Sequence, residues 1–196
     1  MNKKKYPIFI AAGVLLIVAI FFIVSYNSLV KKEEKVKLQW NEMQNAYQRR
    51  LDLIPSLVNT VKGTAEFEQT TLQEIAEARA KAASVTISGD GPVADQYQQQ
   101  TNAQNELAGA ANHLLIKVEK YPTLQGTAAF RGLQAQLEGT ERRIKFARKD
   151  FNAAVADYNS SVRGFPTKIV AGMFGFRARD GFTADEGSDQ SKEIKF

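Results

Sequence analysis

The sequence predicts an all-α protein, in which an N-terminal transmembrane helix precedes an antiparallel four-helix bundle and an irregular C-terminal tail. Three observations lead to this fold class. The stretch 6–30 carries no charge, and residues 8–24 within it are apolar throughout. After this stretch, apolar residues recur at alternating intervals of three and four, which keeps them on one face of a helix. No strand pattern of comparable strength appears.

The composition excludes several kinds of site. A chain of 196 residues suits one sizeable domain. It has no cysteine, which excludes disulfides and thiolate sites, and its single histidine excludes a multi-histidine metal centre. Lys3, Lys4 and Lys5 supply three of the 26 basic residues, so the remaining 23 face 21 acidic residues. A body this close to neutrality does not favour nucleic acid as a partner.

The apolar stretch predicts a retained membrane anchor. A spanning helix needs about 20 residues, and this stretch supplies them. A buried core helix would carry a polar face, and a signal peptide would have a shorter apolar region followed by a small-residue cleavage site. We therefore divide the chain into a basic N-terminus (1–5), a transmembrane helix (6–25), a helical bundle domain (26–164) and a C-terminal tail (165–196), apolar at first and then polar and loose.

Lysines flank the anchor on both sides, so the positive-inside rule nearly ties. Lys3 to Lys5 precede it, and four lysines lie within 31–37 on the other side, mixed with Glu33 and Glu34. A compact basic region before the first apolar run is typical of a signal anchor. We therefore expect an N-terminus inside the cell and a body in the periplasm or outside.

The first soluble helix carries its apolar residues in phase through Pro55. Proline removes one N–H and leaves the carbonyl of Leu51 without an intrahelical donor, so we expect a kink rather than an end. Gly63 and Thr64 suit a helix stop followed by a new N-cap. The three-four rhythm nevertheless continues into Ala65, which would suit one longer helix and a three-helix body. The inward positions are Val36, Trp40, Met43, Tyr47, Leu51, Ile54, Val58, Val61 and Ala65.

Three further helices follow. The second extends to about Ser84, with Leu72, Ile75, Ala76 and Ala83 facing inward. The third extends from Val93 to about Lys120, with a polar, Gln-rich front (95–106) and inward positions Leu107, Ala111, Leu114 and Val118. The fourth ends at 164–166, and its inward positions are Phe130, Leu133, Leu137, Ile144, Ala147, Phe151, Val155, Tyr158 and Val162. Helices of this kind with short connections form bundles.

In order and spacing, five motifs resemble the LemA family: YNSLV after the anchor, QRRLDLIPSLVNTVKG, EKYPTL, ERRIKFARKDFNAAVADYNSSVRGFP and AGMFGF. The resemblance implies a membrane-anchored antiparallel helical bundle of bacterial origin whose biochemical role is poorly defined. It brings no catalytic residues and no cofactor. The chain departs from the family pattern at Thr64 and Phe67, where an aromatic residue and a histidine are common, and at Phe151, where tyrosine is common. A family histidine site would therefore be absent here.

Arg49, Arg50 and Asp52 interrupt the apolar face of the first soluble helix. Arg49 and Asp52 are three residues apart and can pair on the helix surface. Arg50 borders the apolar face, so its stem can lie on apolar surface with the guanidinium in water. Alternatively, Arg50 binds an acid of the fourth helix and sets the register of the bundle near Pro55; the candidate acids are Glu138, Glu141 and Asp150. A role in binding a substrate is a third alternative. The structural or interaction residues are then Arg49, Arg50, Asp52, Pro55, Glu141 and Arg148.

Other titratable residues do not form a recognisable catalytic set. His113 has no second ligand near it in the sequence, so we expect a solvated or hydrogen-bonded side chain. Glu138 and Glu141 share a helix face with Arg142, Arg143 and Lys145, which is typical of a charge-patterned surface. We predict no catalytic residues, no metal and no cofactor.

The tail begins with an apolar segment flanked by Lys168 and Arg177. This segment suits a patch at the membrane surface, and it suits equally well a cap that folds back over the open end of the bundle. The patch residues are Ile169, Val170, Met173, Phe174 and Phe176.

These observations favour a scaffold or adaptor of the bacterial envelope rather than an enzyme. We expect a single-pass protein of the inner (cytoplasmic) membrane that binds the bilayer through residues 6–25. It would bind envelope proteins or further copies of itself, with the Gln-rich front as one contact, and would help to organise the membrane. The alternatives are a regulator of a membrane protease or a hydrolase-type enzyme, and a sensor of a small ligand held between the helices.

Overall fold

A computed structural model describes residues 6–62, 68–85 and 94–182. Throughout these ranges the regular structure is helical, which confirms the all-α class. The helices are α1 (Tyr6–Lys62), α2 (Gln69–Ser84), α3 (Ala94–Val118), α4 (Pro122–Gln125), α5 (Ala128–Arg163) and α6 (Thr167–Phe174).

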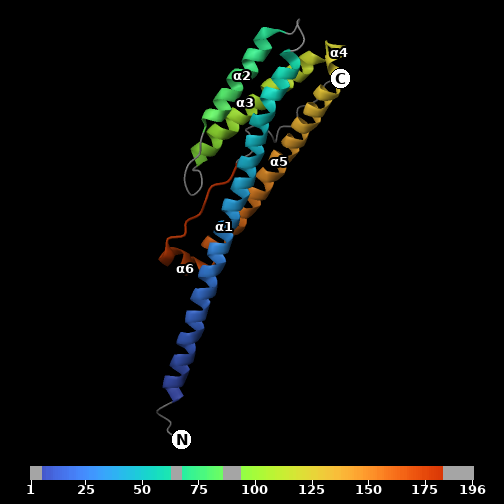
Figure 1. Cartoon of the computed structure of the whole chain (residues 1–196). Coiled ribbons are helices and arrows are strands. Elements are labelled where there is room, and N and C mark those ends of the chain that lie inside the picture. Colours follow the sequence, from blue (N-terminus) through green and yellow to red (C-terminus); the bar gives the residue numbers. More distant parts are fainter. Residues whose placement is uncertain (1–5, 63–67, 86–93, 183–196) are drawn as a thin grey trace, which may run out of the picture.

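Helix α1 is continuous over 57 residues, so the predicted anchor and the first soluble helix are one element. Its N-terminal part projects alone from the body, and the other helices surround its C-terminal part (Figure 1). The projecting part is long and apolar enough to cross a membrane, and little of it is buried. The helix also continues through Pro55.

Two pairs of neighbouring helices make up the body (Figure 1). Helix α5 lies along α1, where Lys32 contacts Asp157 and Arg50 contacts Glu141, so the two helices run in opposite directions. Helix α3 lies along α2 with the same opposed order, because Glu68 contacts Lys117 and Lys81 contacts Glu106.

The core consists of two clusters stacked along the body. The aromatic cluster lies nearer the anchor, and the aliphatic cluster lies at the far end. The buried members of the aromatic cluster include Leu29, Val36, Trp40, Met43, Tyr47, Tyr97, Ile144, Phe151, Tyr158 and Val170. Those of the aliphatic cluster include Leu51, Ile54, Leu57, Val61, Ile75, Leu107, Leu114, Val118, Leu124, Phe130 and Leu137.

The inward faces predicted for the first, third and fourth soluble helices are confirmed, apart from the half-buried Val58, Leu133 and Ala147 and from Ala65, which lies outside the described residues. The face predicted for the second helix is wrong in part. Ala76 and Ala83 are exposed, and the buried residues are Thr71, Ile75, Ala78 and Ala82. Alanines lie on both the buried and the exposed sides of this helix, so they do not mark one face.

The predicted break at Gly63 and Thr64 lies outside the described residues. Helix α1 ends at Lys62, and α2 begins at Gln69. Helix α5 begins after an N-cap, where the Thr127 hydroxyl accepts a hydrogen bond from the Phe130 N–H at 3.2 Å.

The prediction of an irregular tail is wrong for its first part, because Thr167–Phe174 forms α6. Gly175, with φ of 79°, ends α6 in the left-handed conformation that glycine favours. The Phe176 N–H then bonds back to the Ala171 carbonyl at 3.0 Å. The chain reverses there, so that residues 177–182 return along the body.

Candidate functional site

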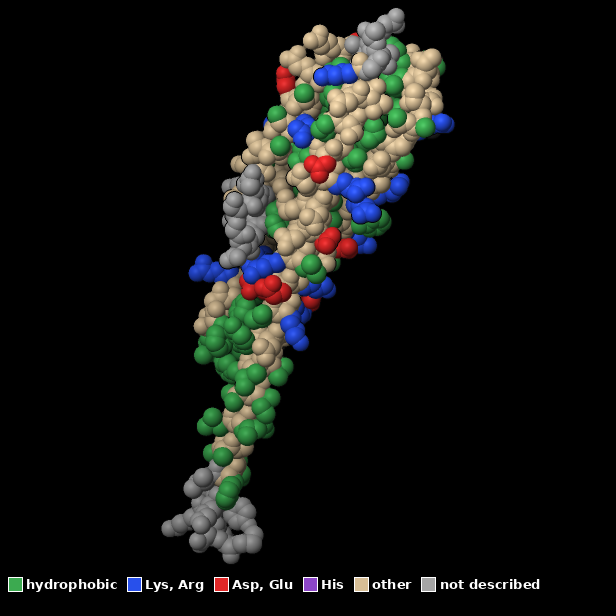
Figure 2. Space-filling model, viewed as in Figure 1, with side chains coloured by type: hydrophobic (Ala, Val, Ile, Leu, Met, Phe, Trp, Pro, Cys, Tyr) green, Lys and Arg blue, Asp and Glu red, His purple; other side chains and the backbone are tan. Residues whose placement is uncertain are grey.

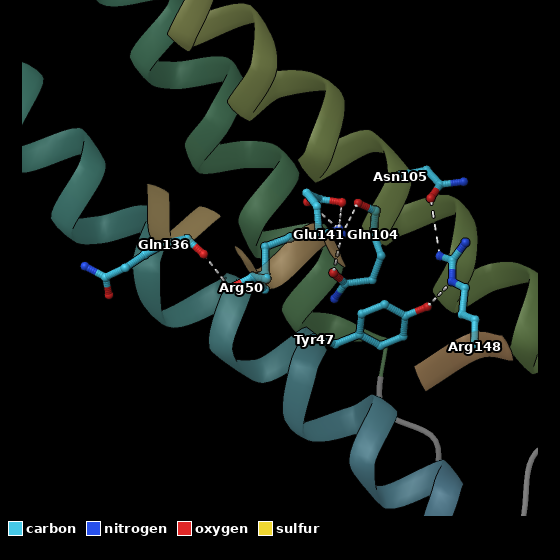
Figure 3. Close-up of polar contacts among 8 residues, drawn as sticks. Tyr47, Arg50, Gln104, Asn105, Gln136, Glu141 and Arg148 are labelled. Atoms are coloured by element: carbon cyan, nitrogen blue, oxygen red, sulfur yellow. Dashed lines mark hydrogen bonds and ion pairs between the residues drawn. The ribbon is translucent and has the colours of Figure 1, made fainter. Parts of the chain in front are cut away.

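The Arg50 side chain lies inside the body and is only 2% exposed. Its guanidinium donates to the backbone carbonyl of Gln104 at 2.9 Å and to the Gln104 side-chain oxygen at 3.0 Å. It also contacts a carboxylate oxygen of Glu141 at 2.6 Å (Figure 3). The interpretation that this guanidinium lies in water is therefore wrong. Of the three acids considered as partners, the structure places Glu141 against Arg50.

Arg50 belongs to a buried polar layer between the two core clusters. Gln44 and Gln100 exchange side-chain hydrogen bonds at 2.9 Å in each direction. The layer also contains the buried side chains of Gln104, Thr101 and Thr140. Burial of a charge needs paired groups, and a shift of α5 by one helical turn, about 5.4 Å, would separate Arg50 from its carboxylate.

The polar layer explains part of the Gln-rich front of α3. Gln100 and Gln104 are buried against α1, so they are not available to a partner protein. The prediction that this front is a contact surface is wrong for these two residues. Gln104 instead accepts hydrogen bonds from the Arg50 guanidinium.

Arg148 lies at the edge of the same layer (Figure 3). Its Nε donates to the Tyr47 hydroxyl at 3.1 Å, and a terminal nitrogen approaches the Asn105 side-chain oxygen at 3.4 Å. The guanidinium carbon also lies 5.8 Å from the centre of the Tyr47 ring and 5.6 Å from that of Phe182. Arg148 thus joins α5 to α1, α3 and the returning tail.

The carbonyl that Pro55 leaves without an intrahelical donor has a partner on another helix. Arg79 of α2 donates its Nε–H to the Leu51 carbonyl at 3.0 Å. Because a buried carbonyl without a donor is costly, this contact lets α1 continue through the proline.

The remaining predicted residues lie at the surface. Asp52 accepts a hydrogen bond from Gln48 at 2.8 Å rather than pairing with Arg49. His113 Nδ1 lies 3.1 Å from a Glu74 carboxylate oxygen, as expected for an exposed, hydrogen-bonded histidine. Glu138 accepts from Gln134 on its own helix at 3.2 Å, whereas Glu141 binds Arg50.

An open groove of about 440 Å³ lies between α1 and α5. Its floor includes Ala46 and Ala147, and Phe146 on its rim is 61% exposed. Four charged residues also line it: Glu42, Arg49, Arg143 and Asp150. Because α1 and α5 run in opposite directions, the two acids lie at about one level, nearer the anchor, and the two arginines at another.

The structure divides the predicted membrane-surface patch between two faces of α6. Val170 is buried in the aromatic cluster, and Phe176 packs against the same cluster. The assignment of these two residues to a lipid-facing patch is therefore wrong, because Val170 of α6 and Phe176, which follows α6, pack on the body. Ile169, Met173 and Phe174 are exposed.

Among the described residues, no three His, Cys, Asp or Glu side chains gather as they would around a metal ion.

The LemA family model matches residues 39–196, which is most of the chain. The chain belongs to the LemA family. Magnetosome protein MamQ of Magnetospirillum gryphiswaldense is 24% identical over 210 residues, covering 96% of this chain and 76% of the relative. Magnetosome protein MamQ 2 of Paramagnetospirillum magneticum is 24% identical, covering 84% of this chain and 66% of the relative. Protein LemA of Metamycoplasma hominis is 23% identical, covering 80% of this chain and 69% of the relative.

The LemA-family match confirms the resemblance seen in the five motifs. None of the three relatives carries the name of an enzyme, which is weak support for a protein without catalytic activity. The family match begins at Gln39, after the apolar segment of α1. The evidence for a membrane-associated protein is therefore the length and composition of that segment together with the family.

Two asparagines of this LemA-family chain hold the returning tail, and the sequence reasoning missed both. Asn159 exchanges two hydrogen bonds with the backbone of Arg179, at 2.7 and 2.8 Å. Asn152 does the same with Phe182, at 3.0 and 2.8 Å. Seven residues span about 10.5 Å of helix, and three residues span about 10 Å of extended chain. The spacing of seven on one helix face was the available signal.

The returning tail also closes the aromatic cluster. The Phe182 ring lies 4.9 Å from Tyr97, 5.5 Å from Phe151 and 6.4 Å from Trp40, centre to centre. Burial in this cluster raises the pKa of Tyr97 above its ordinary value. The aromatic cluster is therefore built from α1, α3, α5 and α6 together with the segment that follows α6.

Proposed function

We propose that this LemA-family protein is a membrane-anchored scaffold or adaptor of the bacterial envelope. Its body is an antiparallel four-helix bundle made by the C-terminal part of α1 with α2, α3 and α5. The apolar part of α1 holds the bundle at the inner membrane, with the body in the periplasm or outside the cell. The protein acts by binding envelope proteins and further copies of itself, and so contributes to membrane organisation.

The observation that supports this proposal most directly is the groove between α1 and α5. Phe146 is a large apolar side chain on its rim, and exposed aromatic residues of this kind often anchor partners. The floor of Ala46 and Ala147 lets another backbone approach closely. The arginines at one end and the acids at the other favour a partner segment of opposite polarity.

Neighbouring charges make a matched pair of variants possible. Arg143 lines the groove, whereas the next residue, Arg142, is exposed and is not among the groove-lining residues. Arg143→Glu combined with Phe146→Ala should abolish binding through the groove. Arg142→Glu changes the same charge on the same helix and should leave binding intact.

The test is the mass and composition of particles extracted gently from the membrane, measured by sizing and native mass spectrometry. We expect wild-type particles to contain more than one copy or a second protein. The double variant should release the lone chain, and the Arg142→Glu control should not. A wild-type protein that is a lone monomer without a partner would contradict the scaffold proposal.

A further inference from the structure

Helix α6 packs on α1 where the apolar segment of α1 ends. The Phe174 ring lies 4.9 Å from the Tyr26 ring, centre to centre, and the Phe176 ring lies 5.7 Å from it. Val170 and Ala171 share the aromatic cluster with Leu29, and Phe21 and Phe22 of α1 pack against that cluster.

The depth of α6 follows from counting along α1, because that helix is unbroken. Twenty residues, 6–25, rise about 30 Å in an α-helix, which equals the thickness of the hydrocarbon core of a bilayer. Tyr26 then lies at the boundary between hydrocarbon and headgroups. Since α6 touches α1 at Tyr26, α6 lies at that boundary as well.

The face of α6 that points away from α1 is apolar. Ile169 and Met173 are four residues apart, so they lie one turn apart on one side of the helix. Phe165 lies in the turn that precedes α6. Phe165 is 86% exposed, and Ile169, Met173 and Phe174 are 51–67% exposed. An exposed face of this kind in water would be a liability for a soluble protein.

Figure 2 shows how this face joins the rest of the surface. Hydrophobic side chains cover the slender N-terminal part of the molecule and continue without interruption onto the base of the body, where α6 lies. Lys, Arg, Asp and Glu side chains begin at about the level of this base and continue up the body. Helix α6 itself carries the exposed Lys168, so the apolar and the charged surfaces meet at α6.

We propose that α6 is a second membrane contact, whose outer face of Ile169 and Met173, flanked by the exposed Phe165 and Phe174, inserts between the headgroups and acyl chains of the bilayer that α1 crosses. The occupant of this face is lipid rather than protein, because the face continues the apolar surface of the anchor at the same depth. This inference rests on the proposed anchoring by α1.

Two contacts constrain the body more than one. A helix that crosses a bilayer alone can tilt and rotate, and its orientation is set by packing and interfacial anchors. With α6 in the interface beside α1, both the height and the tilt of the body are fixed. Val170 and Ala171 transmit this constraint, because they attach the other face of α6 to the aromatic cluster.

The experiment uses the full chain in phospholipid nanodiscs. Because the protein has no cysteine, each introduced cysteine carries a single spin label. Met173→Cys reports on α6, Ile17→Cys on the anchor, and Ile116→Cys on an exposed apolar side chain of α3 at the far end of the body. The accessibility of each label is measured with oxygen, which concentrates in lipid, and with a water-soluble paramagnetic reagent.

We expect the accessibility ratio at position 173 to resemble that at position 17, with a shallower depth, and to differ from that at position 116. Lipid exposure at 17 with aqueous exposure at 173 would overturn the second contact and leave the anchor intact. Aqueous exposure at 17 would overturn the anchor itself. Ile169→Cys, on the same face, replaces Met173→Cys if that variant does not fold as judged by circular dichroism.

Discussion

Removing the Glu141 carboxylate should destabilise the protein more than removing the guanidinium that it binds. Glu141→Ala leaves Arg50 buried, with only the neutral oxygens of Gln104 as acceptors. A buried charge without its partner costs about 3–5 kcal/mol. Arg50→Met instead leaves a carboxylate that is 48% exposed and can be hydrated. This second variant loses stability mainly because the Gln104 side-chain oxygen stays buried without a donor, which costs about 1–3 kcal/mol.

The double variant separates these two costs. With Arg50→Met present, Glu141→Ala removes no partner of a buried charge, so the double variant should be no less stable than Arg50→Met alone. The matched control is Glu138→Ala. Glu138 is exposed, lies three residues away on the same helix and contacts Gln134, so its loss should change the free energy of unfolding by less than about 0.5 kcal/mol.

The assay is thermal unfolding of the full chain in detergent micelles, followed by circular dichroism. In a chain of this size, 1 kcal/mol corresponds to about 2–4 °C in Tm, so Glu141→Ala should lower Tm by about 6–20 °C. If Glu141→Ala lowers Tm no more than Glu138→Ala does, Arg50 is hydrated in solution and the argument from burial is wrong.

Three further predictions use the same assay. Arg79→Met should cost about 1–3 kcal/mol of stability, because the Leu51 carbonyl that Pro55 frees loses its donor. Pro55→Ala in that background should restore stability, because it returns an N–H to the helix. If it does not, the hydrogen bond from Arg79 is not what stabilises α1 at the proline. Gly175→Ala should cost about 1–2 kcal/mol, because the residue has a positive φ, whereas Gly172→Ala within the same helix should be neutral or stabilising. Burial raises the pKa of Tyr97 above its ordinary value of 10.0, so the folded state holds its proton more tightly. Stability should therefore fall as pH rises above 10.0, the ordinary pKa of tyrosine, and Tyr97→Phe should reduce that fall.

The sequence predicted the helices best where large apolar residues set the period. In α1, Trp40, Met43 and Tyr47 can be hidden from water only on one face, so the spacing determines the orientation of the helix. Helix α2 has no such residues apart from Leu72 and Ile75. Alanine loses little by exposure, so the buried face of α2 is decided by α3, which the local sequence does not contain.

The candidate site was predictable only in part, for a related reason. The position of Arg50 at the edge of an apolar face allowed either hydration or a buried pair. The choice depends on Gln104, 54 residues away, whose oxygens replace the water that the guanidinium loses. The tail illustrates the same limit, since Thr167–Phe174 is helical because Val170 has a cluster of distant residues to enter.

The unbroken course of α1 links the membrane to the groove. No hinge separates the apolar segment from the body, so the residue count along α1 determines the distance between that segment and the groove. Ala46 follows Tyr26 by twenty residues. On the proposed anchoring, this places the groove floor about 30 Å above the boundary between hydrocarbon and headgroups. Pro55 lies farther from the membrane still, so bending at the proline would move the far end of the body and leave the groove in place. On the proposed function, a partner must therefore present an apolar residue flanked by opposite charges at about this height. A partner whose binding segment lies at the membrane surface could not reach Phe146.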